Sequence, residues 1–432
     1  MSSSDVRGSD KAGEPDESYG NNGVCLLEAN IGLYIFDMAE GNNGFENHFY
    51  VTGVRRESGG DNYFLARITD KGVVDPGFGG GYIFGSFATN LPSQALSVST
   101  LTDGRVLISG TVANSYPGLV RFNMDGTPDK TFGVNGSVVL DFLKECNVDG
   151  EVVVKESDVS ERPRSSASDG SNMIVFPDGS ILLAHTNRHT SRKWLIRLKA
   201  NGSLDHGFQG EGYVDVTRAS SQRIEGLALQ IINGVEKLVI TGYLRIPYPN
   251  ESGFLVKGFI SRYEINGDPD TSFGVNGYVE LQEPEESELW GVDIQQDGKI
   301  LAIGRTPPPH IGGGDPSSGL VVRLKEGGVI EFISRIEKGH ELEWISGLEQ
   351  RDKKIVVVGS YWGGDGGFGV VGRYLDNGGP DTGFGGNSDG IVIFPSPGMA
   401  RVIAVQSDGA LVACGSVSNN GTGTPAILRF LG

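Results

Sequence analysis

Cysteine is scarce in this sequence: only Cys25, Cys146 and Cys414 occur among 432 residues, and no two of them form a CxxC pair. This excludes a disulfide framework and a zinc site built from cysteine pairs. No run of 18 or more apolar residues is present either, so no membrane-spanning helix is expected. Long helical patterns are also missing. These absences leave a globular chain that is built without long helices.

Basic residues are too few to balance the acidic ones, because 36 Lys and Arg stand against 54 Asp and Glu, for a formal charge of −18. Such a field repels phosphate backbones unless a local basic patch overcomes it. The most basic stretch, RHTSRKW (188–194), is short and lies between strand-like runs. We therefore expect no nucleic-acid partner.

The first thirty residues lack a charged start followed by an apolar stretch, so no secretory signal is visible. Taken alone, this predicts a cytoplasmic protein. Residues 1–15 are polar, and we expect them to be flexible.

Glycine is abundant (67 residues), which together with 38% apolar and 21% charged residues suits many short strands joined by tight turns. The stretch DTSFGVNGYVEL (270–281) has near-copies elsewhere in the chain, at 16–27, 75–87, 129–142, 205–216 and 381–394. A motif repeated this often indicates a structural role in the fold and not a catalytic one.

Each copy ends a longer pattern of strands. A hairpin with a central Asp-Gly comes first, as in VFPDGSILLAHT (175–186), because Gly accepts the positive φ of a tight turn. A third strand follows, as in LIRLKANG (195–202), and the repeated motif then supplies a turn and a fourth strand. Each unit therefore predicts a four-stranded antiparallel sheet.

Residue types assign structural roles within the repeated motif. Asp270 is expected to accept hydrogen bonds from the next backbone N–H groups, and Phe273 to bury its ring beneath the turn. Gly274 and Gly277 suit backbone conformations that a side chain forbids. A calcium loop is the rival interpretation, but it has too few acidic ligands and no recurring bidentate Glu. We interpret the motif as a structural corner.

Counting third strands gives seven units. Residues 321–336 keep the third strand but lack the DxSFG corner, and Lys353 stands where the hairpin glycine is expected. The chain begins on a corner and fourth strand and ends on a third strand. We therefore predict an all-β, seven-bladed β-propeller of four-stranded antiparallel blades, with strand 23–28 pairing with strand 425–430. The alternative, an open solenoid, needs capping repeats at both ends.

The corner and hairpin motifs, written as lvRl..dG.lD.sFG..G.v followed by q.DGkilv.G, resemble the bacterial delta-60 repeat family, a β-propeller domain of unknown function. The resemblance extends over about residues 16–432, with the sixth unit degenerate and the third expanded. It implies a single propeller domain, a bacterial origin and an extracellular or surface location, from which the missing signal sequence departs. It carries over no catalytic residue, because its defining positions are structural.

Ligand-binding residues of a propeller are expected where the first strand of each unit begins, since loops of several blades meet there. The candidate first strands lie around 33–39, 94–101, 171–176, 224–231, 289–295, 342–349 and 401–406. Eight residues at or near their starts are the candidate ligand-binding residues: Arg223, Glu225, Glu288, Trp290, Glu341, Glu343, Trp344 and Arg401.

Two carboxylates near Arg and Trp would suit sugar chemistry, in which one acid protonates a leaving oxygen and the other activates water or attacks. The alternative is that EPEESE (283–288) is a solvated acidic loop and that the tryptophans fill gaps between blades. His185 and His189 lie on a strand and its loop, without helical zinc spacing. We expect no metal and no cofactor, and no nucleotide-binding or hydrolase motif is present.

The leading hypothesis is a monomeric, non-enzymatic scaffold that presents one composite site to a protein or glycan. The loop residues differ between units, which disfavours seven equivalent sugar sites. One alternative is a polysaccharide-active hydrolase or lyase, and another is a component or effector of a bacterial secretion or toxin system. Two insertions, 143–170 and 306–319, interrupt the repeat, and the proline-rich second one is a candidate for partner contact.

Overall fold

The computed structural model describes residues 12–27, 32–58, 60–89, 91–113, 115–140, 173–187, 191–219, 221–248, 253–284, 286–307, 316–364, 366–419 and 422–432. The chain divides into two compact units. Unit 1 consists of Met1–Ala29, Asp70–Val73 and Ser221–Gly432, and unit 2 of Asn30–Thr69 and Val74–Ser220. A single domain over 16–432 stays a prediction. Among the described residues, no helix has the length and apolar character needed to cross a membrane.

Unit 2 contains three four-stranded antiparallel sheets, blades 1 to 3. Blade 1 consists of β2 (Leu33–Glu40), β3 (Phe49–Arg55), β4 (Asn62–Ile68) and β5 (Tyr82–Gly85). Blade 2 consists of β6 (Ser93–Thr100), β7 (Val106–Val112), β8 (Tyr116–Phe122) and β9 (Ser137–Val139). Blade 3 consists of β10 (Met173–Val175), β11 (Ile181–Thr186), β12 (Lys193–Leu198) and β13 (Tyr213–Asp215). The insertion at 143–170 lies outside the described residues.

Unit 1 contains the other four blades. Blade 4 consists of β14 (Arg223–Ile232), β15 (Val235–Pro247), β16 (Phe254–Glu264) and β17 (Tyr278–Glu280). Blade 5 consists of β18 (Glu288–Ile294), β19 (Ile300–Thr306), β20 (Ser318–Leu324) and β21 (Ile330–Ile336). Blades 6 and 7 are built from β22 (Glu341–Glu349), β23 (Ile355–Gly363), β24 (Gly366–Tyr374), β25 (Ile391–Val405), β26 (Leu411–Asn419), β27 (Thr422–Phe430) and β1 (Val24–Leu26). Of the insertion at 306–319, residues 308–315 lie outside the described part.

The last two blades share strand β25. Its first part pairs with β24 as the fourth strand of blade 6, and its second part, from Gly398, pairs with β26 as the first strand of blade 7. The order of this seven-stranded sheet, β1-β27-β26-β25-β24-β23-β22, therefore holds two blades. Seven four-stranded blades are thus present among the described residues.

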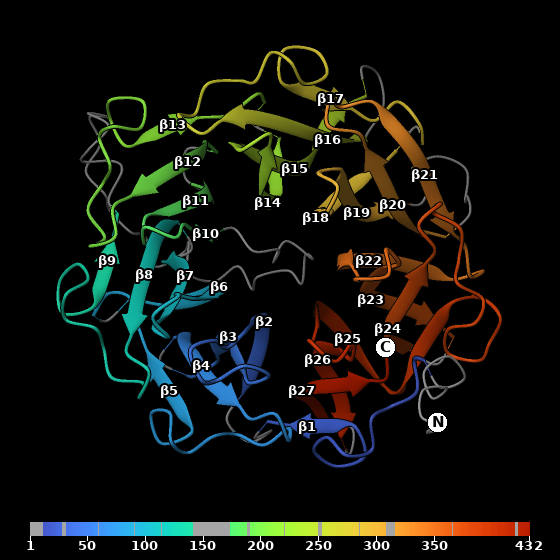
Figure 1. Ribbon diagram of the computed structural model, residues 1–432, viewed down its shortest axis with the longest axis horizontal. Coiled ribbons are helices and arrows are strands. Elements are labelled where there is room, and N and C mark those ends of the chain that lie inside the picture. The colour runs from blue at the N-terminus through green and yellow to red at the C-terminus, as the bar shows by residue number, and fades with distance from the viewer. Residues whose placement is uncertain are drawn as a thin grey trace, which may run out of the picture. The chain divides into compact units, whose positions relative to one another are not determined.

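The N-terminal strand completes blade 7. β1 pairs antiparallel with β27, with Cys25 opposite Ile427, and Figure 1 draws blue β1 beside red β27. The predicted pairing of strand 23–28 with strand 425–430 is confirmed, as is the propeller fold class. Because β1 pairs with Ala426–Leu428, this part of β27 is not an exposed sheet edge.

Residues just before β1 also belong to blade packing. Ala12 is buried in the core between blades 6 and 7, and the amide of Gly13 donates to the carbonyl of Leu431 at 2.7 Å. The predicted flexible segment 1–15 is therefore too long at its C-terminal end, since residues 12–15 are packed. Residues 1–11 lie outside the described part of the chain.

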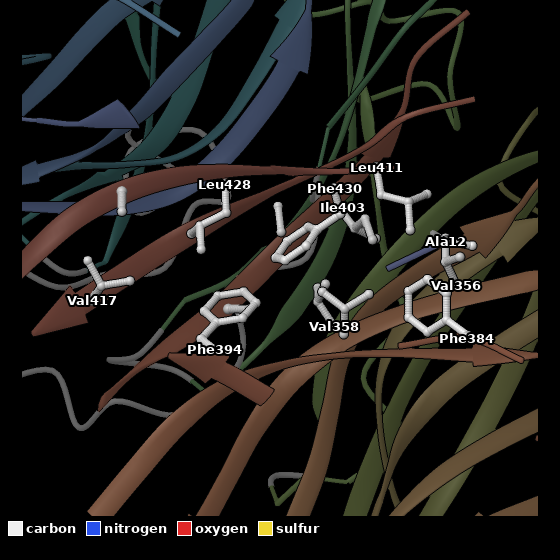
Figure 2. Packing of buried hydrophobic residues seen from close by; sticks show 14 residues of the cluster. Ala12, Val356, Val358, Phe384, Phe394, Ile403, Leu411, Val417, Leu428 and Phe430 are labelled. Carbon is white, nitrogen blue, oxygen red and sulfur yellow. The ribbon is translucent and has the colours of Figure 1, made fainter. Parts of the chain in front are cut away.

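The hydrophobic core lies between the faces of neighbouring blades. Between blades 6 and 7, Figure 2 shows buried side chains from both sheets: Val356, Val358, Phe384, Phe394, Ile403, Leu411, Leu428 and Phe430. Central strands such as β23 are covered on both faces, so their apolar residues run consecutively instead of alternating with polar ones. Burial of each such side chain contributes roughly 1.5–3 kcal/mol.

The repeated motif is a structural corner, as predicted. Asp270 Oδ1 accepts hydrogen bonds from the backbone N–H and the hydroxyl of Ser272, at 3.0 and 2.6 Å. Its Oδ2 accepts from Arg262 Nε at 2.7 Å, and the Arg262 guanidinium lies 4.6 Å from the centre of the buried Phe273 ring. Burial would raise the pKa of Asp270, but the Ser272 hydrogen bonds and the Arg262 charge together lower it to about 2.

The corner also fastens one blade to the next. Arg262 Nη1 donates to the carbonyl of Glu326, and the amide of Gly274 donates to that of Gly327 at 3.1 Å, both in the β20–β21 turn of blade 5. The Arg–Asp pair eight residues apart recurs at Arg67–Asp75, Arg121–Asp129 and Arg373–Asp381, with N–O distances of 2.7, 2.7 and 2.8 Å. The corner arginine contacts a carbonyl of the next blade in the same way at Arg67–Met124 and Arg121–Ala200, so the repeated motif joins neighbouring blades within each unit.

Blade 5 retains more of the corner than its sequence indicated. Glu331 takes the place of the aspartate and accepts from Arg323 Nε at 2.6 Å. The Arg323 guanidinium lies 4.6 Å from the centre of the Phe332 ring, as in the regular corners. The prediction that this unit had lost the corner is thus wrong for the ion pair and the aromatic ring, because a longer acidic side chain reaches the same arginine.

Candidate functional site

A β-bulge occurs at the same place in the first strand of six blades. In each, the register shifts by one residue relative to the second strand. The extra residues are Phe36, Leu96, Glu225, Trp290, Ile345 and Arg401. A bulge turns its extra side chain away from the direction that strand alternation would give it. Three of the eight candidate residues are therefore bulge residues.

The strand opposite the bulge needs a glycine. In blade 5, a Cβ on Gly304 would lie 1.8 Å from the carbonyl oxygen of Glu288, so no other residue fits there without moving the backbone. The residue after this glycine lies opposite the residue two positions before the bulge, and its identity varies: Val54, Thr111, Tyr243, Arg305, Ser360 and Ser416. The fold thus requires glycine at this position, whereas the residue at the next position can vary between blades.

Arg305 joins two carboxylates from different blades. Its Nε donates to Glu288 Oε2, on the neighbouring strand of blade 5, at 2.9 Å. Its Nη1 donates to Glu343 Oε2, on β22 of blade 6, at 3.1 Å. The exposed fractions of the Arg305, Glu288 and Glu343 side chains are only 25%, 6% and 16%. Two acids and one base are therefore held together with little contact with water.

Trp290 lies against the same guanidinium. The Arg305 Cζ atom is 4.8 Å from the centre of the Trp290 ring, and the tryptophan is 5% exposed. A cation over an indole face at this distance is attracted by the ring quadrupole. Trp290 therefore contacts Arg305, and its role in ligand binding stays a prediction.

Burial and charge shift the pKa values of both partners. Burial would lower the pKa of Arg305, but the Glu288 and Glu343 charges outweigh it and the pKa is raised. Burial is also the largest effect on Glu343, whose pKa is raised although the Arg305 charge opposes the shift. Groups with shifted pKa values that meet in one place are typical of functional sites.

Charged groups from blades 4 and 7 extend the cluster. Burial raises the pKa of the buried Tyr243 hydroxyl, and the charges of Glu225 and Glu288 raise it further. Arg401 on β25 acts on Glu343 in the opposite sense, lowering its pKa. We call the set from blades 4 to 7 the inter-blade cluster: Glu225, Tyr243, Glu288, Trp290, Arg305, Glu343 and Arg401.

The eight candidate residues thus fall into different places. Five belong to the inter-blade cluster: Glu225, Glu288, Trp290, Glu343 and Arg401. Arg223 is exposed at the start of β14, opposite Tyr243. Glu341 is exposed at the start of β22, opposite Trp362.

Trp344 does not reach this surface. It is fully buried in the core between blades 5 and 6, where its Nε1 donates to the Tyr374 hydroxyl at 2.8 Å. Its place in the register is that of Leu289, because Trp344 lies opposite Gly359 as Leu289 lies opposite Gly304. Glu288 and Glu343 hold equivalent positions, but Trp290 follows its glutamate by two residues and is the bulge residue, whereas Trp344 follows directly. The expectation of a ligand contact for Trp344 is wrong in this structure.

Sequence reasoning missed Arg305, Tyr243 and Trp362. The signal that was present is the variable position after the hairpin glycine, where Arg305 is the only charged residue among the six blades that have the bulge. In the described part of the chain, no group of three or more His, Cys, Asp or Glu side chains could hold a metal ion.

Comparison with known proteins supports the repeat and the fold. The family described as "Domain of unknown function (DUF5122) beta-propeller" matches residues 101–132, which confirms the delta-60 resemblance there. No curated protein matches the chain.

Solved structures with similar folds include the β-propeller domain of the Trilobed protease from Pyrococcus furiosus, with 8% identity, 93% of this chain and 94% of that chain covered, and a TM-score of 0.43. Drosophila Semaphorin 2a has 10% identity, 92% and 74% coverage and a TM-score of 0.48. The α-L-arabinofuranosidase Arb93A from Fusarium graminearum has 10% identity, 98% and 96% coverage and a TM-score of 0.42. At these values the likeness concerns the fold and carries no function.

Proposed function

We propose that the protein is a non-enzymatic binding scaffold with one composite ligand site at the inter-blade cluster, on a fold whose residues 101–132 match the DUF5122 β-propeller family. The partner is a protein or a glycan. The observation that carries the proposal is the placement of Arg305 between Glu288 and Glu343, which come from two blades.

The cost of burying these charges supports a functional role. Taking an ion pair out of water costs several kcal/mol per ion, and apolar residues of similar volume often stabilise a fold as well or better. Blade 7 shows that the fold does not need the charges, because Met399 and Ser416 occupy the positions of Glu288 and Arg305. Charges that the architecture does not require favour a role in recognition.

Variation between blades supports a single site. The corner residues repeat around the chain, whereas the bulge residue and the residue after the hairpin glycine differ from blade to blade. Seven equivalent sites would need these positions to repeat as well. One composite site across blades 4 to 7 fits the variation.

The position of Arg305 favours binding over hydrolysis. A two-carboxylate glycosidase needs room between its acids for the glycosidic oxygen and, in inverting enzymes, for a water molecule. Here one guanidinium lies between Glu288 and Glu343 and forms an ion pair with each of them. The second candidate, a polysaccharide-active enzyme, is favoured by the raised pKa of the buried Glu343, which is a property of a general acid.

The test combines binding and product detection on a glycan and protein array. The variants Glu288→Gln, Glu343→Gln and Arg305→Ala should each weaken binding to the partner that the native protein selects. Asp297→Asn is the matched control, because it alters an ion pair with Lys299, 3.0 Å long, at the other end of the same hairpin. Binding that none of the three variants changes would refute the site. New reducing ends or unsaturated products, lost in Glu343→Gln, would establish the enzyme instead.

A further inference from the structure

An exposed tryptophan lies close to the inter-blade cluster. Trp362, near the end of β23, is 47% exposed, which is unusual for so large an apolar side chain. It is not part of the core between blades 5 and 6, unlike Trp344. Its exposure therefore requires an explanation other than packing.

The indole of Trp362 lies over a glycine. Trp362 is opposite Gly367 on β24, and a Cβ added to Gly367 would lie 2.8 Å from the Trp362 Cζ3 atom. Any larger residue at 367 would push the ring away. Gly367 thus supports one side of a flat ring, and much of that ring is exposed to solvent.

The register places this ring on the same side of blade 6 as the acidic residues. Glu341 lies opposite Trp362, and Glu343 lies opposite Ser360, which is two residues before Trp362 on β23. Opposite residues and those two apart share one face of a sheet, and two residues span about 7 Å. An apolar ring and two carboxylates therefore stand within reach of one sugar unit, whose ring has an apolar face and a hydroxyl-bearing edge.

The charges near this ring disfavour an acidic ligand. Glu288, Glu341 and Glu343 act electrostatically on one another or on Arg305, and Arg401 adds a second positive charge. Three carboxylates thus stand against two guanidinium groups, in a chain with a net charge of −18. A uronate or sulfated polymer would add negative charge to a surface that already has an excess of it.

A basic peptide is also less suited than a neutral glycan. Arg305 already binds the carboxylates of Glu288 and Glu343, so a lysine or arginine from a partner would have to compete with it. Hydroxyl groups need no such exchange, because each one both donates to a carboxylate and accepts from a guanidinium. Arg305 has five N–H donors, and its ion pairs with Glu288 and Glu343 use the Nε hydrogen and one Nη1 hydrogen.

Resting on the proposed binding function, we infer that the ligand is an uncharged glycan and that one of its sugar rings stacks on Trp362. Glu341 and Glu343 accept hydrogen bonds from its hydroxyl groups. The site thereby selects neutral polysaccharides against acidic ones.

The experiment measures retardation of the 432-residue protein in native gels. The gels contain a neutral polymer (mixed-linkage β-glucan, xylan, galactomannan or dextran), an acidic one (polygalacturonate or alginate) or poly-lysine. At least one neutral polymer should retard the native protein, and Trp362→Ala should weaken that binding by about tenfold or more. Trp362→Phe should bind more tightly than Trp362→Ala and less tightly than the native protein. Phe84→Ala, an exposed aromatic residue on the outermost strand of blade 1, is the control and should bind as the native protein does.

Three outcomes would overturn the inference: tighter binding to the acidic polymers, binding to poly-lysine alone, or retardation by none of the neutral polymers. If the protein binds an acidic polymer or poly-lysine and Glu343→Gln alters that binding, the proposed scaffold and its site stand, but the inference of a neutral glycan ligand is refuted. Cleavage of a polymer without stable binding would instead overturn the scaffold itself.

Discussion

Replacement of Arg305 by alanine is the sharpest test of how the inter-blade cluster is built. The change removes the cation that Glu288 and Glu343 share, at 2.9 and 3.1 Å, and leaves two carboxylates with little access to water. Breaking a fully buried pair costs about 3–5 kcal/mol, whereas an exposed pair contributes about 0–1 kcal/mol. Since the Arg305 side chain is 25% exposed, we expect a loss of about 2–3 kcal/mol near neutral pH.

The loss should depend on pH. Without Arg305 the pKa of Glu343, already raised by burial, rises further in the folded state. A carboxyl group with a raised folded pKa contributes stability at low pH and loses it as pH rises through that pKa. The destabilisation should therefore be small at about pH 4 and full at about pH 8, because the acids are protonated at the lower value.

Urea unfolding followed by tryptophan fluorescence measures this effect, and urea is preferred because guanidinium ions would replace the lost side chain and screen the carboxylates. Adding Glu343→Gln to Arg305→Ala should recover part of the loss, since the substitution removes one uncompensated charge. Arg223→Ala, at an exposed arginine at the start of β14, is the matched control and should change stability little. An equal loss at both pH values, or no recovery in the double variant, would refute the reasoning.

Three further variants concern single residues in blades 5, 6 and 7. Burial raises the pKa of Asp293 from 3.8 to about 6, so ionisation of this side chain lowers stability as pH rises from about 4 to about 6. Asp293→Asn should therefore stabilise the protein by up to about 3 kcal/mol at about pH 8 and hardly at all at about pH 4. Thermal unfolding measures this gain, and a gain that does not vary with pH would contradict burial of the charge as its cause. Lys353 has a φ of 67°, a conformation that glycine adopts without cost, so Lys353→Gly should raise the unfolding free energy by about 0.5–1 kcal/mol. The reciprocal Gly409→Lys, at the equivalent turn of blade 7 with φ 90° and open space around it, should lower that free energy by a similar amount, and a loss in Lys353→Gly would show that the lysine makes compensating contacts.

The repeat made the fold predictable. Hairpin glycines, alternating strands and the DxSFG corner are local signals, and their recurrence reduces errors that a single copy would leave. The complementary ends of the chain predicted the pairing of β1 with β27 for the same reason, because each end is a fragment of a known unit. Even the altered corner of blade 5 keeps its arginine, acid and aromatic ring, although Glu331 replaces an aspartate.

The candidate site was predictable only in part. Glu288, Trp290 and Glu343 were identified from their place at the start of first strands, and the structure brings them together around Arg305. Trp344 was misplaced because the bulge adds one residue to the first strand, and no local preference marks where it does so. A one-residue difference in register moves a side chain to the opposite face of a sheet.

The amino-acid sequence by itself determined the number of blades, their strand order and the way the two ends meet, since these follow from turn chemistry and alternation that each repeat carries within itself. Only the tertiary structure decided which charged side chains meet. Arg305 is 38 residues from Glu343, and their contact exists because first strands of adjacent blades pack beside each other at bulges of matching register. Such a contact depends on the packing of blade against blade, which no segment of the chain encodes alone.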